Sequence, residues 1–170
     1  MNDIVEQFIE LFESGGPVLI VILITSIFLW LLIIERYYYY FLVYPEKLSL
    51  IITQWTSRTD HSSWYALRIR DGLLADISIT LKQYLIPIQT FTSILPLLGL
   101  LGTVTGMIAI FDVLNVFGTG NTRGMASGIS RALLPTTAGL VTSMAGLYFS
   151  SDLDRRAKLQ AEKAQDLLEF

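Results

Sequence analysis

The sequence predicts an all-α membrane protein with three transmembrane helices. Of its 170 residues, 52% are apolar and only 16% are charged. The apolar residues are concentrated in three runs: Gly15 to Ile34, Gln83 to Phe111, and Ala132 to Ser151. Each run reaches the roughly 20 residues that a helix needs to cross the hydrocarbon core, and none contains Asp, Glu, Lys, Arg or His. We therefore expect a multi-pass membrane protein.

The distribution of basic residues predicts the orientation of these spans. Residues 1–17 contain no Lys or Arg, whereas most basic residues lie between spans one and two or after span three. Only Arg123 and Arg131 lie between spans two and three. Because Lys and Arg beside membrane helices are retained in the cytoplasm, we expect a periplasmic N-terminus and a cytoplasmic C-terminus.

The same pattern divides the chain into seven segments. We expect, in order, a periplasmic amphipathic helix (1–14), transmembrane helix 1 (15–40), a cytoplasmic helical loop (41–82), transmembrane helix 2 (83–111), a periplasmic loop with the start of helix 3 (112–130), transmembrane helix 3 (131–151) and a cytoplasmic tail (152–170). The first helix should end at Gly15-Gly16-Pro17, and the loop should hold two helices separated near Ser57 to Ser63. Span one is bulky throughout, so it is expected to face lipid.

Small residues mark one face of spans two and three. In span three they recur at intervals of four and three, at Ala132, Thr136, Gly139, Ser143, Gly146 and Ser150. In span two they lie at Gly99, Gly102, Gly106 and Ala109. Such stripes allow helix backbones to approach closely in a membrane. Spans two and three should therefore pack on each other or on neighbouring copies, inside an outer layer formed by span one.

Two threonines lie on these helices, Thr103 in mid-span and Thr136 about one turn into span three. Each hydroxyl either bonds back to its own helix, at the carbonyl four residues earlier, or faces a passage. Pro135 removes one backbone hydrogen bond beside Thr136. This opening favours a passage-facing hydroxyl at Thr136.

The spans contain no ionisable side chain in their interiors, and Asp112 and Arg131 lie at the outer ends of spans two and three. Proton carriers in membranes normally depend on such a group, so a proton path here would need an acid from another chain. The sequence has no catalytic array, metal-spaced cluster, P-loop or cysteine, so we expect no enzymatic activity, metal or cofactor. The net charge of −3 gives no support to nucleic-acid binding.

Two segments carry a family resemblance. Leu98 to Gly106 resembles the LLGTVxG segment, and Gly128 to Val141 resembles the GIAEALLATAxGLV segment, of the ExbB, TolQ and MotA proton-channel family. Gly-Gly-Pro before span one and Glu35-Arg36 after it also fit this family. The chain is most similar to a short ExbB of an auxiliary TonB system.

The resemblance implies a bacterial inner-membrane homopentamer whose second and third helices line a pore. That pore would hold helices of an ExbD-like partner with a membrane aspartate, and proton flow would energise a TonB-like protein. Thr103 and Thr136 match the pore threonines that face the aspartate. The implied pore wall or helix packing comprises Gly99, Gly102, Gly106, Ala132, Gly139 and Ser143. Two other functions are compatible with the sequence: a TolQ-type subunit for outer-membrane constriction, and a passive scaffold for partner helices.

The sequence also departs from the family pattern. Arg131 stands where ExbB commonly has a glutamate, which reverses the local charge. Arg131 therefore either pairs with Asp112 or a partner acid at the outer mouth, or extends to the lipid headgroups. Pro135 replaces a small residue. The short cytoplasmic loop argues against a MotA-like stator.

Overall fold

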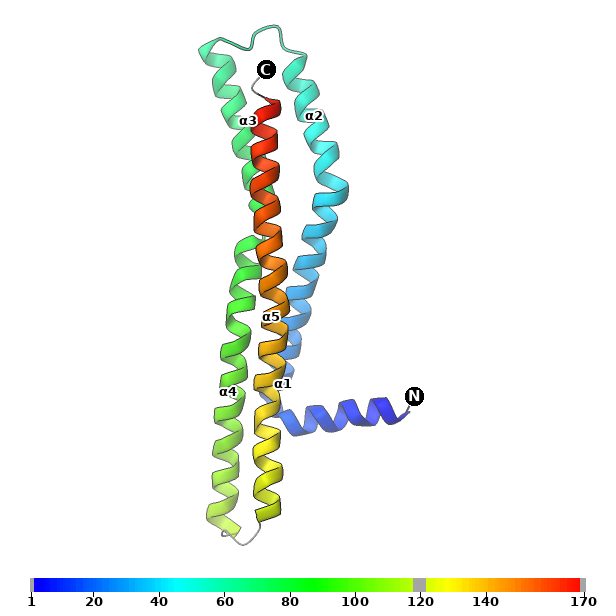
Figure 1. Cartoon of the computed structure of the whole chain (residues 1–170), viewed down its shortest axis with the longest axis vertical. Helices are drawn as coiled ribbons and strands as arrows, with labels where there is room; N and C mark the ends of the chain where they lie inside the picture. The colour runs from blue at the N-terminus through cyan, green and yellow to red at the C-terminus, as the bar shows by residue number, and fades with distance from the viewer. Residues whose placement is uncertain (1, 118–121, 169–170) are drawn as a thin grey trace. The chain divides into compact units, whose positions relative to one another are not determined.

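The computed structural model describes residues 2–117 and 122–168, and within these ranges the regular elements are all helices, with no strand. In chain order the elements are α1 (Asn2–Tyr38), the π-helical segment η1 (Tyr39–Val43), α2 (Tyr44–Thr56), α3 (Trp64–Lys82), α4 (Leu85–Phe117) and α5 (Thr122–Leu167) (Figure 1). Three stretches are long and apolar enough to cross a membrane: Gly15–Thr56, Trp64–Asp112 and Gly128–Leu167. The predicted fold class is confirmed.

The chain forms two compact units. The first comprises Met1–Trp30 and Thr90–Leu147, and the second comprises Leu31–Gln89 and Tyr148–Phe170. The boundary falls inside α1, α4 and α5.

In the first unit, α1 changes direction at Gly16, where the sequence predicted the end of the N-terminal helix. Gly16 has a φ of 67°, in the left-handed region that glycine adopts without steric cost, and Pro17 begins the next helical stretch. Residues 2–14 run crosswise to the stretch after Pro17 (Figure 1). The side chains that would make this segment amphipathic lie outside the described residues.

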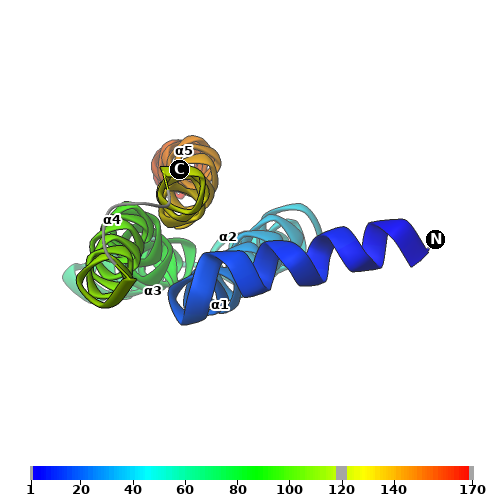
Figure 2. The same cartoon turned by 90° about the horizontal axis from the view of Figure 1, so that it is seen from below.

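The apolar part of the first unit consists of three helices, α1, α4 and α5, seen end-on in Figure 2. From α1, Leu19, Ile22 and Leu29 are buried. Other bulky residues of α1 are exposed, including Ile20, Leu23, Ile27 and Phe28. This exposed surface is what a helix at the lipid boundary presents.

The membrane helices continue beyond their predicted ends. α4 extends to Phe117 and α5 begins at Thr122. The segment predicted as a periplasmic loop with the start of helix 3 (112–130) is thus helical at 112–117 and 122–130, and residues 118–121 lie outside the described part. α4 can continue because no Gly or Pro occurs between Met107 and Phe117. The predicted tail is likewise a continuation of α5, because the sequence after Gly146 contains no helix breaker.

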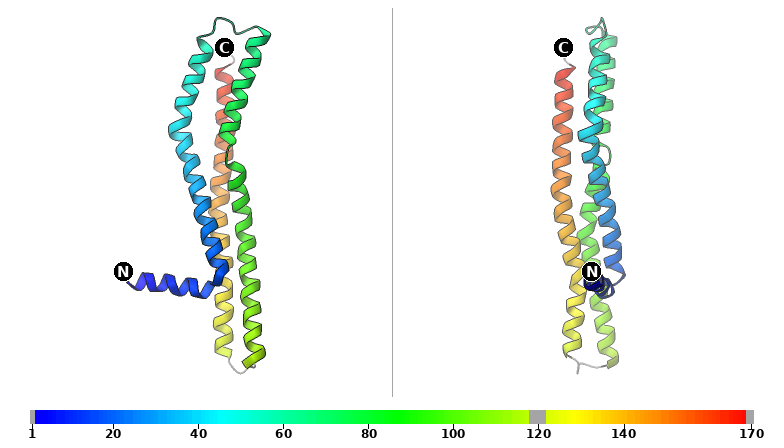
Figure 3. Two further views of the ribbon diagram at one scale, coloured as in Figure 1. Left: turned by 180° about the vertical axis from the view of Figure 1, so that it is seen from behind. Right: turned by 90° about the vertical axis from the view of Figure 1, so that its right-hand side faces the viewer.

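The second unit contains the two helices predicted between residues 41 and 82. These are α2 and α3, joined by the segment 57–63, with the last part of α5 alongside them (Figure 3). η1 joins α1 to α2 without leaving a helical path. Two hydroxyls connect the helices: Tyr40 donates to the Leu81 carbonyl (2.7 Å) and Tyr44 donates to the Gln160 carbonyl (3.1 Å).

Arg36 is the buried charge of the second unit, with 2% of its surface exposed. Its guanidinium lies 4.8 Å from the ring centre of Tyr39 and 5.0 Å from that of Tyr84. It also donates to the Glu35 carboxylate (2.8 Å) and to the Thr80 carbonyl (3.1 Å). Tyr84, with a φ of 62°, is the junction between α3 and α4. Arg36 thus connects α1 to the end of α3 and to this junction.

Candidate functional site: a hydroxyl-bearing helix seam

The site is the contact between α4 and α5 in the first unit, from Thr92 to Gly106 on α4 and from Ala132 to Gly146 on α5. We call this contact the seam. Glycines allow the two backbones to meet. A Cβ atom on Gly99 would lie 2.9 Å from the Thr136 Cα, and one on Gly139 would lie 2.6 Å from the Leu95 carbonyl oxygen. Neither backbone neighbour can rotate away, so these positions require glycine.

Two further contacts of the seam pair a glycine of α4 with a small or rigid residue of α5. The ring of Pro135 lies against Gly102, where an added Cβ would be 2.3 Å from the proline Cβ. Gly106 faces Ala132, and a Cβ atom added to Gly106 would lie 2.7 Å from the Ala132 Cβ. The proline that replaces the family's small residue is therefore accommodated by the glycine opposite it.

Thr103 of α4 and Thr136 of α5 donate to adjacent carbonyls on one turn of α4. The Thr136 hydroxyl donates across the seam to the Gly99 carbonyl (2.7 Å). The Thr103 hydroxyl donates to the next carbonyl along, that of Leu100, also at 2.7 Å. Thr103 thus bonds to its own helix, three residues earlier rather than four. Both residues are partly exposed. We call these two hydroxyls the threonine pair.

A third hydroxyl of the seam belongs to Ser143, which is buried and donates to the Thr92 carbonyl (2.9 Å). Pro96 lies four residues after Thr92 and has no amide hydrogen, so this carbonyl lacks its usual helical donor. Ser143 supplies the missing hydrogen bond. The sequence reasoning missed this pairing, although a proline inside an apolar helix signals a released carbonyl four residues earlier.

The small-residue ribbon of α5 lies on its buried side. Ala132, Gly139, Ser143 and Gly146 are buried in the first unit, and Gly146 lies against Thr92 and Leu29. Ser150 is buried in the second unit. The opposite face of α5 exposes bulky residues, namely Leu133, Leu140, Val141, Met144 and Leu147. In the single chain the ribbon is therefore a packing surface.

The two outer charges, Asp112 and Arg131, are both exposed. Within residues 2–117 and 122–168, no described ion pair joins them; the ion pairs found there all lie in the second unit, as Glu35–Arg36, Arg70–Asp71, Asp152–Arg156 and Asp154–Lys158. Of the alternatives for Arg131, pairing with a partner acid and extension to the headgroups agree with its exposure.

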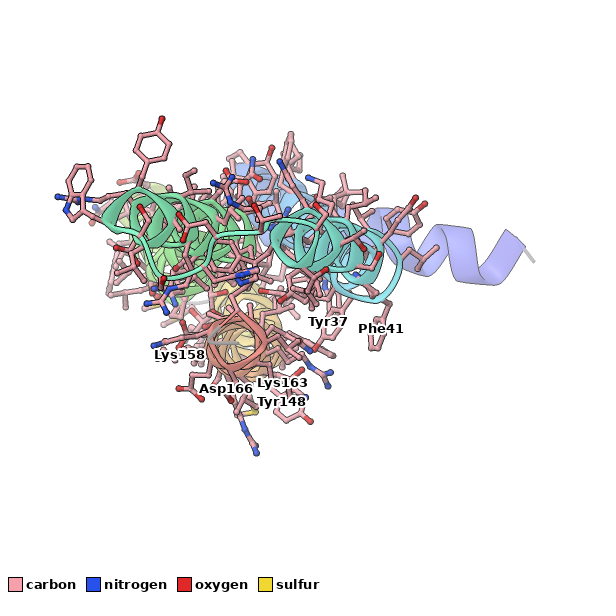
Figure 4. All side chains as sticks on the ribbon, turned by 90° about the horizontal axis from the view of Figure 1, so that it is seen from above. Tyr37, Phe41, Tyr148, Lys158, Lys163 and Asp166 are labelled. Atoms are coloured by element: carbon pink, nitrogen blue, oxygen red, sulfur yellow. The ribbon has the colours of Figure 1, made fainter. Side chains whose placement is uncertain are left out.

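The second unit has a polar cluster that the sequence reasoning did not identify. The Asp152 carboxylate accepts hydrogen bonds from the Tyr37 hydroxyl and from Arg156 Nε, each at 2.6 Å. The guanidinium lies 5.7 Å from the Tyr37 ring and 5.8 Å from the Phe41 ring. Figure 4 shows Tyr37 and Phe41 on the side of the bundle near Tyr148, while Lys163 and Asp166 project from α5 away from α2 and α3. The cluster links the end of span one to the end of span three.

His61 is partly buried in the second unit. Its ring lies edge-on to Trp55, with centroids 5.0 Å apart, and Nε2 lies 3.1 Å from the Trp55 carbonyl. Among the residues whose side chains the structure describes, no group of His, Cys, Asp or Glu is placed to hold a metal ion.

Comparison with known proteins identifies the family. The MotA/TolQ/ExbB proton channel family matches residues 56–166, which is more than half of the chain and includes the whole seam. The chain belongs to this family. It is therefore a multi-pass membrane protein of a family of proton-channel and motor subunits.

Two relatives from Synechocystis sp. (strain ATCC 27184 / PCC 6803 / Kazusa) share this similarity, and both are named as candidate biopolymer transport proteins. ExbB-like 3 is 35% identical over 89 residues, which cover 51% of this chain and 42% of the relative. ExbB-like 1 is 44% identical over 63 residues, covering 35% of this chain and 25% of the relative. The matched region thus spans less than half the length of either relative. No solved structure matches the chain.

Proposed function

We propose that this proton-channel family member is an ExbB-like inner-membrane subunit of a motor driven by the proton-motive force. Its partner would be an ExbD-like protein with a membrane aspartate, and the motor would energise a TonB-like protein for transport across the outer membrane. The proposal rests on the family membership and on one geometric observation. The Thr103 and Thr136 hydroxyls donate to adjacent carbonyls on one turn of α4, inside spans that contain no Asp, Glu, Lys, Arg or His.

The seam supplies hydrogen-bonding oxygen atoms for a proton path but no group that carries the proton. Hydroxyl and carbonyl oxygens can hydrogen-bond to a proton carrier, but neither titrates near neutral pH. An ion path through a membrane normally uses an ionisable group. The acid would therefore come from a partner helix. One elementary charge that crosses 100 mV releases about 2.3 kcal/mol, so repeated transfers could supply mechanical work.

The exposed surfaces of α4 and α5 support assembly with other helices. α4 exposes a bulky stripe, consisting of Leu97, Leu100, Val104, Ile108 and Phe111, and α5 exposes the bulky face described above. We propose that these faces are covered by further copies of the chain, in a homopentamer, and by membrane lipid. The proposed topology has a periplasmic N-terminus and a cytoplasmic C-terminus, in agreement with the basic residues.

Substitution of the threonine pair tests the proposed path. Thr103→Val and Thr136→Val keep the side-chain shape and remove the hydroxyl. We expect both variants to assemble but to lose most TonB-dependent uptake. Thr137→Val is the matched control, because the Thr137 hydroxyl donates to the Leu134 carbonyl of its own helix, outside the pair. Full uptake by both test variants would instead favour the passive scaffold.

Affinity capture from membranes tests the partner. We expect the captured complex to contain a protein with a single membrane helix that carries an aspartate, together with a TonB-like protein. Recovery of a TolA-like protein would favour the TolQ-type role in outer-membrane constriction. Recovery of the chain without any foreign membrane helix would contradict the proposal.

A further inference from the structure

The hydroxyl protons of the threonine pair are already in use. A threonine hydroxyl has one proton to donate and two lone pairs that accept. Thr136 gives its proton to the Gly99 carbonyl and Thr103 gives its proton to the Leu100 carbonyl, both at 2.7 Å. Each oxygen atom therefore presents lone pairs, and no proton, to a group that approaches the pair.

Three other threonines of these spans are committed in the same way. The hydroxyl of Thr105 donates to the Leu101 carbonyl, that of Thr137 to Leu134, and that of Thr142 to Ala138. Spans two and three also contain no Lys, Arg or His that could stabilise a carboxylate.

We infer that the threonine pair recognises the protonated, neutral form of a partner's carboxylic acid and disfavours the carboxylate. This inference rests on the proposed function and specifies the state in which the partner acid is held. A neutral acid brings the proton that the threonine oxygens can accept. A carboxylate would meet the negative ends of two hydroxyl dipoles in a medium with little solvation. The pair is therefore a site that binds the acid in its protonated form.

The sign of a pKa change distinguishes this arrangement from the opposite one. If the hydroxyls accept from the neutral acid, their removal destabilises the protonated form and lowers the pKa of the acid. If the hydroxyls instead turn and donate to the carboxylate, their removal raises that pKa. One net hydrogen bond corresponds to a shift of about one pKa unit.

The experiment uses the complex as purified from membranes with its own partner. Dicyclohexylcarbodiimide is the probe, because it reacts with protonated carboxyl groups in apolar surroundings, and the pH of half-maximal labelling reports the pKa. We expect this pH to fall by about one unit in Thr103→Val and in Thr136→Val. Thr136→Ser keeps the hydroxyl and Thr137→Val lies outside the pair, so both should label like the unmodified complex.

The outcomes separate the inference from the proposed function. Thr103→Val remains informative if Thr136→Val fails to assemble, because the Thr103 hydrogen bond lies within its own helix. A half-labelling pH that rises, or that stays unchanged in both variants, would overturn the inference while leaving the partner acid in place. A complex whose partner contains no reactive membrane carboxyl at any pH would overturn the proposed function itself.

Discussion

The Ser143 hydroxyl of α5 donates a hydrogen bond to the Thr92 carbonyl of α4, at 2.9 Å, inside the first unit. The Thr136 hydroxyl makes the same kind of bond to Gly99, seven residues away along both helices. A spacing of seven keeps two positions on one face of a packed helix pair. The two hydrogen bonds therefore fix the register of α4 against α5 at two points of the glycine-lined contact.

Ser143→Ala should destabilise the protein by about 1 kcal/mol, because the buried Thr92 carbonyl loses a donor that Pro96 cannot replace. The measurement is the free energy of unfolding in detergent. A double-mutant cycle with Pro96→Ala sharpens the test. Alanine restores an amide hydrogen at position 96, so Ser143→Ala should cost less in that background. Equal costs in both backgrounds would show that the serine does not compensate for the proline.

Gly139→Ala should disrupt the seam, because its Cβ would lie 2.6 Å from the Leu95 carbonyl oxygen. Overpacking of this kind typically costs about 1 to 3 kcal/mol and shifts the backbone. Gly72→Ala is the matched control, since a Cβ on this helical glycine meets nothing within 4 Å. We expect the yield of folded protein and its thermal stability to fall for Gly139→Ala alone. Wild-type stability in that variant would disprove the close approach.

Arg36→Lys should weaken the second unit, although it preserves the charge. Lysine cannot reproduce a planar guanidinium that stacks between Tyr39 and Tyr84 while it donates to Glu35 and Thr80. We expect a loss of about 1 to 3 kcal/mol in unfolding free energy. Arg68→Lys, at an exposed arginine over the exposed Trp64 ring, should be nearly neutral. Similar losses of unfolding free energy in the two variants would show that the burial of Arg36 is not the cause of its effect.

The loop between α2 and α3 should loosen only in acid. The Asp60 carboxylate accepts hydrogen bonds from the backbone amides of Ser63 (3.0 Å) and Ser62 (3.1 Å), and these bonds hold its pKa below the ordinary value. Since the folded pKa is lowered, this stabilisation is present above the unfolded pKa, near 3.9, and is lost as the pH falls through the folded pKa.

Amide hydrogen exchange at Ser62 and Ser63, corrected for the intrinsic effect of pH, measures this change. Protection should decrease in acid for the wild type, whereas Asp60→Asn should show the same protection throughout, because its side-chain oxygen accepts without titrating. A pH-dependent loss of protection in Asp60→Asn would assign the change to another group.

The sequence identified the elements better than their limits. The three spans, the change of direction at Gly16 and the two helices around residues 57–63 follow from hydropathy and from glycine and proline, which act locally. The continuation of α4 to Phe117 and of α5 to Leu167 did not follow. A helix does not end where its apolar residues end. It continues until a residue breaks it, and the membrane boundary supplies no such residue.

The sequence by itself determined that this chain spans a membrane, that spans two and three have small-residue faces, and that these spans contain no Asp, Glu, Lys, Arg or His, because composition and spacing alone carry those properties. Only the tertiary structure decided the acceptor of each hydroxyl: Gly99 for Thr136, Leu100 for Thr103 and Thr92 for Ser143. Helical periodicity places a side chain on a face. The register between two helices depends on the packing of both surfaces at once, and that register decides which carbonyl accepts from Thr136 and which from Ser143.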